Sequence, residues 1–149
     1  MVEPSADTPA QGGCLCGGVR YEITQPFHYA LYCHCSRCRR LTGGLVGLNA
    51  RVAREGFRLV SGEELVSVYR PPDGAMPAMF CTNCGSTLFR GPWPDGDWIG
   101  IRLGTLDGDP GIRPQYHTFV DSRASWEELP EDGLPRYPER LPEHLRRRL

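Results

Sequence analysis

The sequence contains no lysine. Its 17 basic residues are all arginines, set against 18 acidic residues in a chain of 149. The formal net charge is therefore only -1, and the sequence pI is near 6.4. Non-specific binding to nucleic acid depends on a strong basic field, because contacts to phosphate supply most of that affinity. The near-neutral balance thus argues against nucleic acid as a partner.

A long apolar run is also missing. No stretch approaches the roughly 20 apolar residues of a membrane-spanning helix, so no membrane partner is expected. Residues 1–12 lack the basic and apolar regions of a secretory signal, and we expect them to form a flexible N-terminal arm. These absences predict a soluble, cytoplasmic protein, in which thiols stay reduced and cysteine clusters bind metals or take part in catalysis.

Cysteine, by contrast, is plentiful and clustered. The seven cysteines fall into three groups: Cys14 with Cys16, then Cys33, Cys35 and Cys38, and finally Cys81 with Cys84. An odd number of thiols, in a chain long enough to bury a core, argues against a disulfide framework. The Cys-x-x-Cys-Gly motif at residues 81–85 is typical of a zinc knuckle, in which glycine lets the backbone fold around the ion. We therefore predict zinc as the cofactor.

Groups of two, three and two cysteines can fill one four-ligand site and leave three ligands over. The natural division joins the first pair to the last pair in a closed structural site, with zinc–sulfur bonds of about 2.3 Å. Spacing does not force this division, since Cys33 and Cys35 would also complete four ligands with the last pair. We nevertheless expect the group of three to stay intact, because its members are close in sequence. This division gives two zinc ions per chain.

An ion held by only three thiolates keeps one position open and carries a net charge of about -1. It is poor at ionising water but well suited to hold an added thiol as a nucleophile. Cys33, Cys35 and Cys38 are therefore the candidate catalytic residues, in a site that is loaded at rest or fills only with substrate. For His34, between two of these ligands, three roles remain open: a fourth zinc ligand, an acid or base in the pocket, or a packed histidine.

The rest of the chain is a series of short segments with strand character, separated by turns. They are residues 19–23, 29–32, 45–52, 57–60, 65–69, 98–103 and 116–120, while the apolar residues at 78–80 and 88–89 flank the knuckle motif. A short helix is predicted at 37–41 with Ser36 as its N-cap, and a frayed one at 143–149. We predict a mainly β domain over residues 13–128, followed by a proline-rich tail over 129–149 that lies over the domain.

Several stretches resemble the glutathione-dependent formaldehyde-activating enzyme family, which also includes relatives of centromere protein V. They are residues 13–21, 33–40, 80–89, 117–119 and 122–126, in the family's order. The resemblance implies small, twisted, mostly antiparallel sheets clamped by a structural zinc, as in methionine sulfoxide reductase B. It also implies the ligand division given above: Cys14, Cys16, Cys81 and Cys84 at the structural zinc, and Cys33, Cys35 and Cys38 at the second.

The chemistry that the resemblance implies is the joining of glutathione to formaldehyde to give S-(hydroxymethyl)glutathione. The expected activity is that of a zinc-dependent carbon-sulfur lyase or synthase acting on a small-molecule thiol and aldehyde. The alternative is a non-catalytic zinc module that binds a protein partner. Candidate binders of glutathione carboxylates are Arg37, Arg39 and Arg40. The distal residues that either contact substrate or pack structurally are His117, Arg123 and Trp126.

Overall fold

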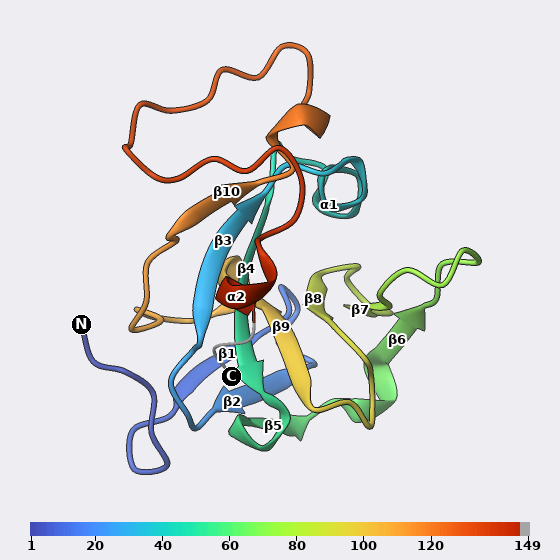
Figure 1. Ribbon diagram of the computed structural model, residues 1–149. Helices are drawn as coiled ribbons and strands as arrows, with labels where there is room; N and C mark the ends of the chain where they lie inside the picture. Colours follow the sequence, from blue (N-terminus) through green and yellow to red (C-terminus); the bar gives the residue numbers. More distant parts are fainter. Residues whose placement is uncertain (147–149) are drawn as a thin grey trace.

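The computed structural model describes residues 1–146, and within them ten strands form two sheets (Figure 1). Helices are short: α1 (Ser36–Thr42), α2 (Glu143–Arg146) and the 3-10 helices η1 (Arg54–Gly56), η2 (Glu63–Leu65), η3 (Leu103–Thr105) and η4 (Val120–Ser122). In this part of the chain, no helix combines the length and apolar character needed to cross a bilayer. The mainly β fold that the sequence predicts is confirmed.

The smaller sheet has the order β1-β2-β5, with antiparallel neighbours: β1 (Ala10–Gly13), β2 (Arg20–Ile23) and β5 (Phe57–Ser61). Alternation along β2 buries Tyr21 and Ile23 and leaves their neighbours half-exposed. Strand β1 begins inside the segment that the sequence assigned to a flexible arm. The end of that arm is ordered because its backbone pairs with β2. Its sequence, Ala-Gln-Gly-Gly, carries no apolar alternation that would have predicted a strand.

The larger sheet has seven strands in the order β10-β3-β4-β9-β8-β7-β6. They are β3 (Tyr29–Cys33), β4 (Gly47–Ala53), β6 (Val66–Tyr69), β7 (Ala78–Cys81), β8 (Thr87–Arg90), β9 (Trp98–Arg102) and β10 (Tyr116–Thr118). Neighbours are antiparallel except for β10 and β3, which run parallel. Their register sets Thr118 beside Cys33, and antiparallel pairing with β4 sets Gly47 on the other side. Cys33 thus ends an interior strand.

Aromatic side chains from both sheets meet in the core. Tyr21 of β2 packs edge-on against Phe89 of β8, with ring centroids 5.1 Å apart, and Phe57 of β5 lies 4.9 Å from the same ring. The Tyr21 hydroxyl is hydrogen-bonded to Thr105 Oγ1 at 2.7 Å. Burial raises the pKa of Tyr21 well above its usual range, so the hydroxyl stays protonated. The Tyr21 ring thus joins the two sheets, and its buried hydroxyl keeps a hydrogen-bond partner.

Helix α1 begins one residue earlier than the sequence predicts. Its N-cap is Cys35 and not Ser36, because the Cys35 sulfur accepts a hydrogen bond from the backbone N–H of Cys38 at 3.3 Å. The helix ends at Gly43, which takes a left-handed conformation with φ 66°. A thiol therefore satisfies one of the free N–H groups at the start of the helix. The cysteine cluster and the helix start form one local unit.

The C-terminal tail turns back along β10. The N–H of His117 donates to Pro135 O at 2.9 Å, the N–H of Tyr137 donates to His117 O at 2.8 Å, and the N–H of Phe119 donates to Glu139 O at 2.9 Å. In Figure 1 the orange segment arches beyond β10 and the red segment returns across the sheet to α2. Of the helix predicted at 143–149, α2 covers the first turn, and residues 147–149 lie outside the described residues.

Candidate functional site

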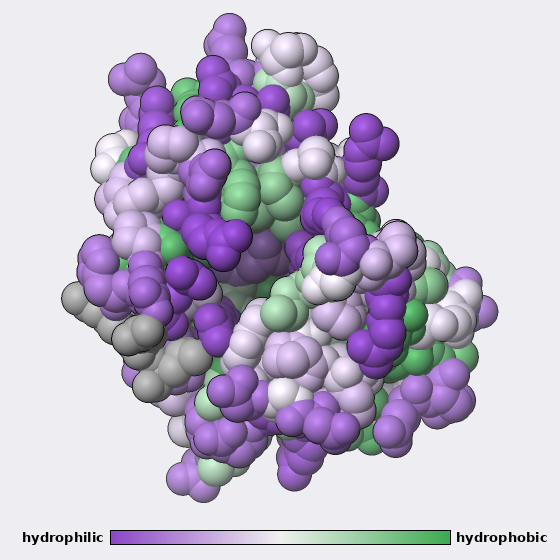
Figure 2. All heavy atoms as spheres, turned by 45° about the vertical axis from the view of Figure 1, so that its right-hand side comes forward, coloured by the Kyte–Doolittle hydropathy of each residue, from purple (hydrophilic) through white to green (hydrophobic). Residues whose placement is uncertain are grey.

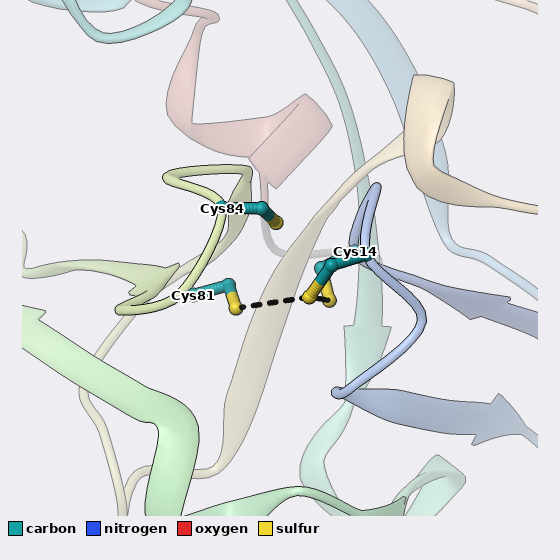
Figure 3. A group of neighbouring side chains, drawn as sticks. Cys14, Cys81 and Cys84 are labelled. Atoms are coloured by element: carbon teal, nitrogen blue, oxygen red, sulfur yellow. Dashed lines mark hydrogen bonds between the residues drawn. The ribbon is translucent and has the colours of Figure 1, made fainter.

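One thiol cluster joins the two sheets. This four-thiol cluster consists of Cys14 and Cys16 after β1, Cys81 at the end of β7, and Cys84 in the following turn. Its sulfurs all lie within 4.8 Å of one another (Figure 3), with Sγ–Sγ distances of 3.5 Å for Cys14–Cys16 and 3.9 Å for Cys16–Cys81. A zinc tetrahedron with bonds of about 2.3 Å has edges of about 3.8 Å, so the donor set fits this ion.

Ser86 links the two loops of the four-thiol cluster. Its hydroxyl oxygen accepts a hydrogen bond from the N–H of Leu15 at 2.9 Å, and the same oxygen lies 3.2 Å from Cys84 Sγ. The contact with Ser86 lowers the pKa of Cys84 to about 5, and the Asn83 side chain lowers the pKa of Cys16. Both shifts favour the thiolate, which is the form that binds zinc. Sequence reasoning missed these two residues, although they lie within and beside the knuckle motif.

The second cluster has three thiols. This three-thiol cluster consists of Cys33 at the end of β3, Cys35 at the N-cap of α1, and Cys38 in its first turn, with all three sulfurs within 4.8 Å of one another. Cys33 and Cys38 are buried, and Cys35 is partly exposed. Hydrogen bonds with Cys33 and Cys35 lower the pKa of Cys38, while hydrogen bonds with Cys35 and Cys38 raise the pKa of Cys33. The three thiols thus influence one another's ionisation.

Two arginines that the sequence analysis missed lie beside Cys38. Arg90 Nη1 is 3.5 Å and Arg102 Nη1 is 3.9 Å from Cys38 Sγ. Arg102 is only 5% exposed, and its Nη1 donates to Asn49 Oδ1 at 2.5 Å. Within residues 1–146, its Nε and Nη2 have no hydrogen-bond partner and no carboxylate pairs with it. Because an unpaired buried cation is costly, a thiolate at Cys38 is the counter-charge that the neighbouring described residues offer to Arg102. The thiolate is also the form that binds zinc.

His34 lies in a row of four side chains, in which Glu127, His34 and His117 are buried and Asp132, at the end, is exposed. Its Nε2 is 2.9 Å from His117 Nδ1, and its Nδ1 is 2.7 Å from Glu127 Oε1. The far nitrogen of His117 is 2.8 Å from Asp132 Oδ2. Burial lowers the pKa of His34 and so favours the neutral ring. Both nitrogens of His34 have partners within the protein, which leaves neither for a metal ion. Packing and hydrogen bonding within this row therefore explain the position of the His117 side chain.

The other residues suggested as substrate contacts lie elsewhere. Arg37 forms an ion pair with Asp73, and Arg39 donates to a backbone carbonyl of η4 at 3.2 Å. Arg123 donates to the carbonyl three residues before it at 2.9 Å and so closes a turn. Trp126 is 74% exposed. None of these four side chains faces the pocket described next.

A pocket of about 340 Å³ opens onto the three-thiol cluster. Cys33 and Cys38 line it, whereas His34 and all members of the four-thiol cluster lie outside its lining. Figure 2 shows a hollow on this face, with apolar side chains inside and hydrophilic ones around the opening. No acidic residue of the described chain lines the pocket. Its basic lining residues are Arg51, Arg90, Arg140 and Arg146.

Comparison with known proteins explains the cysteine pattern. The profile of the family described as "Glutathione-dependent formaldehyde-activating enzyme" matches residues 9–122, which include all seven cysteines. The chain belongs to this family. The resemblance drawn from the sequence motifs is therefore confirmed, and with it the fold.

The chain is also similar to two individual proteins, one found by comparing sequences and one by comparing structures. A Halomonas elongata protein, provisionally named a glutathione-dependent formaldehyde-activating enzyme, is 28% identical over 128 residues, which cover 80% of each chain. The crystal structure of a Rhodobacter sphaeroides protein is also 28% identical, with a TM-score of 0.55 over 66% of this chain and 89% of that one. The family match ends at residue 122. Glu127, Asp132 and the arginines at 140 and 146 therefore lie outside it.

Proposed function

We propose that this family member is a zinc-dependent carbon-sulfur lyase. It would join a small-molecule thiol, with glutathione as the prototype, to a small aldehyde, with formaldehyde as the prototype. One observation carries the proposal: Cys33 and Cys38 line the pocket, whereas the four-thiol cluster does not. A three-thiol cluster with two donors in the wall of a pocket suits a substrate-binding site, while four donors suit a closed structural site. The family match supports the same chemistry.

Two zinc ions per chain are part of the proposal. The four-thiol cluster would hold a structural ion, and the three-thiol cluster would hold the second. When bound, the second ion would supply an open position at which a thiol is held as its thiolate. The fit of the protein to this ion rests on the three converging sulfurs and on the buried Arg102 beside Cys38.

The protein's own residues would prepare the site in two ways. Arg90 and Arg102 offset the negative charge that builds up at Cys38, and so keep the donors deprotonated. Apolar walls, including Leu31 and Phe119, narrow the space above the thiols and limit the water that competes with the substrate. The site thus favours a thiol nucleophile over hydrolysis.

The proposed reaction adds a thiol S–H across a carbonyl C=O. A carbon–sulfur bond forms, the carbonyl π bond breaks, and the proton of the thiol ends on the former carbonyl oxygen. Nothing is oxidised or reduced, so no further reactant is needed. The proton travels through solvent at the open mouth of the pocket. The lyase direction is the reverse of this addition.

A matched pair of variants tests the proposal. Cys35→Ser should lower the zinc content from about two to about one per chain and abolish formation of S-(hydroxymethyl)glutathione, with an unchanged far-UV circular dichroism spectrum. Cys16→Ser makes the same atomic change in the four-thiol cluster. Because that cluster is the proposed structural site, this variant should have a lower melting temperature than wild type. Wild-type turnover in Cys35→Ser would contradict the proposal. If Cys35→Ser unfolds, the three-thiol cluster has a structural role.

The wild-type protein provides the second test. Zinc-loaded protein that forms no adduct from formaldehyde and any of glutathione, cysteine or 2-mercaptoethanol would overturn the enzyme proposal. That outcome would support the alternative, a non-catalytic zinc module that binds a protein partner. Saturable turnover with any of these thiols would exclude the alternative.

A further inference from the structure

A segment outside the family match completes the pocket above the three-thiol cluster. Arg140, Leu141 and Arg146 line this pocket, although the match ends at residue 122. Leu141 is only 3% exposed, so the segment packs on the domain and does not merely pass over it. One wall of the pocket is therefore formed by a segment that lies outside the family match.

The junction between the tail and β10 is held firmly. Phe119, another pocket residue, has φ 56° and ψ 38°, a left-handed conformation that is unfavourable for a residue with a Cβ atom. Its N–H donates to Glu139 O at 2.9 Å, and the next N–H donates to Tyr137 O at 3.1 Å. The strained turn persists because the tail holds it on both sides. Arg140 directly follows this anchored segment, so the backbone that carries it is held beside the pocket.

The arginines of the pocket differ in what they already bind. Arg51 stacks over the Trp98 ring at 4.0 Å from the centroid, and Arg90 Nη2 donates to Met76 O at 3.0 Å. Arg146 Nε donates to Leu141 O at 2.9 Å. Arg140 is exposed and makes no hydrogen bond or ion pair with residues 1–146. Its donors are all available to a ligand in the pocket.

We propose that Arg140 is a specificity-determining residue that, with Arg51, binds a carboxylate on the carrier of the thiol substrate. The site would then prefer anionic thiols to uncharged ones. A guanidinium binds a carboxylate through two parallel hydrogen bonds, and no acidic residue of the pocket competes for it. The inference rests on the proposed function, because it assumes that a thiol enters this pocket.

A binding experiment on the full, zinc-loaded chain tests Arg140 without requiring turnover. The probe is S-methylglutathione, which keeps both carboxylates of glutathione but has no free thiol, and its dimethyl ester serves as the uncharged counterpart. At low salt, calorimetry should show that Arg140→Gln weakens binding of the acid about two- to fivefold, the range expected for an exposed ion pair. Binding of the ester should not change.

The control variant is Arg136→Gln. Arg136 is also exposed, lies on the same tail, and does not line the pocket, so its loss changes the net charge equally. It should leave binding of the acid at the wild-type level. The inference is overturned if Arg140→Gln binds the acid like wild type, if Arg136→Gln loses as much affinity, or if wild-type protein does not bind the acid.

Turnover separates failure of the inference from failure of the proposed function. If wild-type protein forms no adduct from any thiol, the proposed function fails, and the binding data still decide the role of Arg140. If turnover occurs, Arg140→Gln should raise the KM for glutathione by the same factor as the dissociation constant, with an unchanged kcat. Its KM for 2-mercaptoethanol should stay at the wild-type value. An unchanged KM for glutathione would refute the inference alone.

Discussion

His34 Nε2 lies 2.9 Å from His117 Nδ1, and the two rings are almost completely buried. One ring follows β3 and the other lies on β10, its parallel neighbour, so the contact joins segments 83 residues apart. A carboxylate flanks each ring on its outer side, Glu127 at His34 and Asp132 at His117. The pair therefore ties the three-thiol loop to the C-terminal tail.

We predict that Glu127→Ala destabilises the protein. The change leaves His34 Nδ1 buried without its partner, which should lower the free energy of unfolding by about 1–3 kcal/mol. Urea titration of the zinc-loaded protein measures this loss. Glu128→Ala is the matched control, because the neighbouring glutamate is exposed. Equal stability of the two variants would show that the contact contributes nothing.

Arg102→Met should weaken metal binding at the three-thiol cluster alone. The substitution keeps much of the side-chain volume but removes the buried cation beside Cys38, so the thiolates lose their counter-charge. Changes next to metal ligands commonly cost about 10–100-fold in affinity, and competition with a zinc chelator measures this loss. Arg58→Met, in the smaller sheet, removes a solvent-exposed arginine and should retain both ions. Two ions held as tightly in Arg102→Met as in wild type would disprove the counter-charge role.

Gly47→Ala should disturb the three-thiol cluster by crowding. A Cβ atom at Gly47 would lie 2.3 Å from Arg102 Nη1 and 2.9 Å from Cys38 Cβ, so both side chains must shift. Overpacking of this kind costs about 1–3 kcal/mol, and zinc analysis should find about one ion per chain. Gly44→Ala is the control, because the nearest atom to its added Cβ, Thr42 Oγ1, is 3.7 Å away. Full zinc content in Gly47→Ala would contradict this explanation.

The Asp132 carboxylate should make stability depend on pH below neutrality. Its hydrogen bond with His117 lowers the pKa of Asp132, so the folded state holds this proton less tightly than the unfolded state. The resulting stabilisation is complete above about pH 4, the usual range of an aspartate, and is lost as the pH falls through the lowered pKa. Wild type should therefore exceed Asp132→Asn in stability near neutral pH, and the gap should close in acid.

Unfolding curves between about pH 6 and pH 2.5 measure the gap for Asp132→Asn. The reference variant is Glu131→Gln, which removes an adjacent, exposed charge without touching His117. Its stability should follow wild type across the range. A gap that stays constant into acid would show that the Asp132–His117 contact does not depend on ionisation of the carboxylate.

The sequence predicted the parts of the site that are local. The three-thiol cluster and the two pairs of the four-thiol cluster follow from cysteine spacing, because two or three sulfurs within six residues can converge on one point. Spacing left open which groups combine, and the structure joins the first pair to the last. The alternation at residues 98–103 likewise indicated a strand with Ile99 and Ile101 buried. It gave no sign that Arg102 would be buried as well. This strand end is covered on both faces, and the neighbours that accept from the Arg102 guanidinium, Cys38 and Asn49, come from other segments.

The parts that the sequence did not predict depend on contacts between distant segments. Pairing of His34 with His117 needs the parallel register of β10 and β3, and Glu127 reaches His34 only because the chain turns at η4. Arg140 faces the pocket because backbone hydrogen bonds align the tail with β10. The apolar periodicity of one segment does not indicate which distant segment it will contact. Motif analysis does not find these contacts either, because the contacting residues lie far apart in the sequence.

The two thiol clusters become complete at different points of synthesis, because they span different lengths of chain. All three donors of one cluster lie within residues 33–38, so this set is complete as soon as Cys38 has been added. The other cluster must wait for Cys84, and metal binding there closes a large loop whose entropy it has to overcome. The histidine row waits longer still, for Asp132. The C-terminal residues thus enclose a cluster whose donors were all joined much earlier in synthesis.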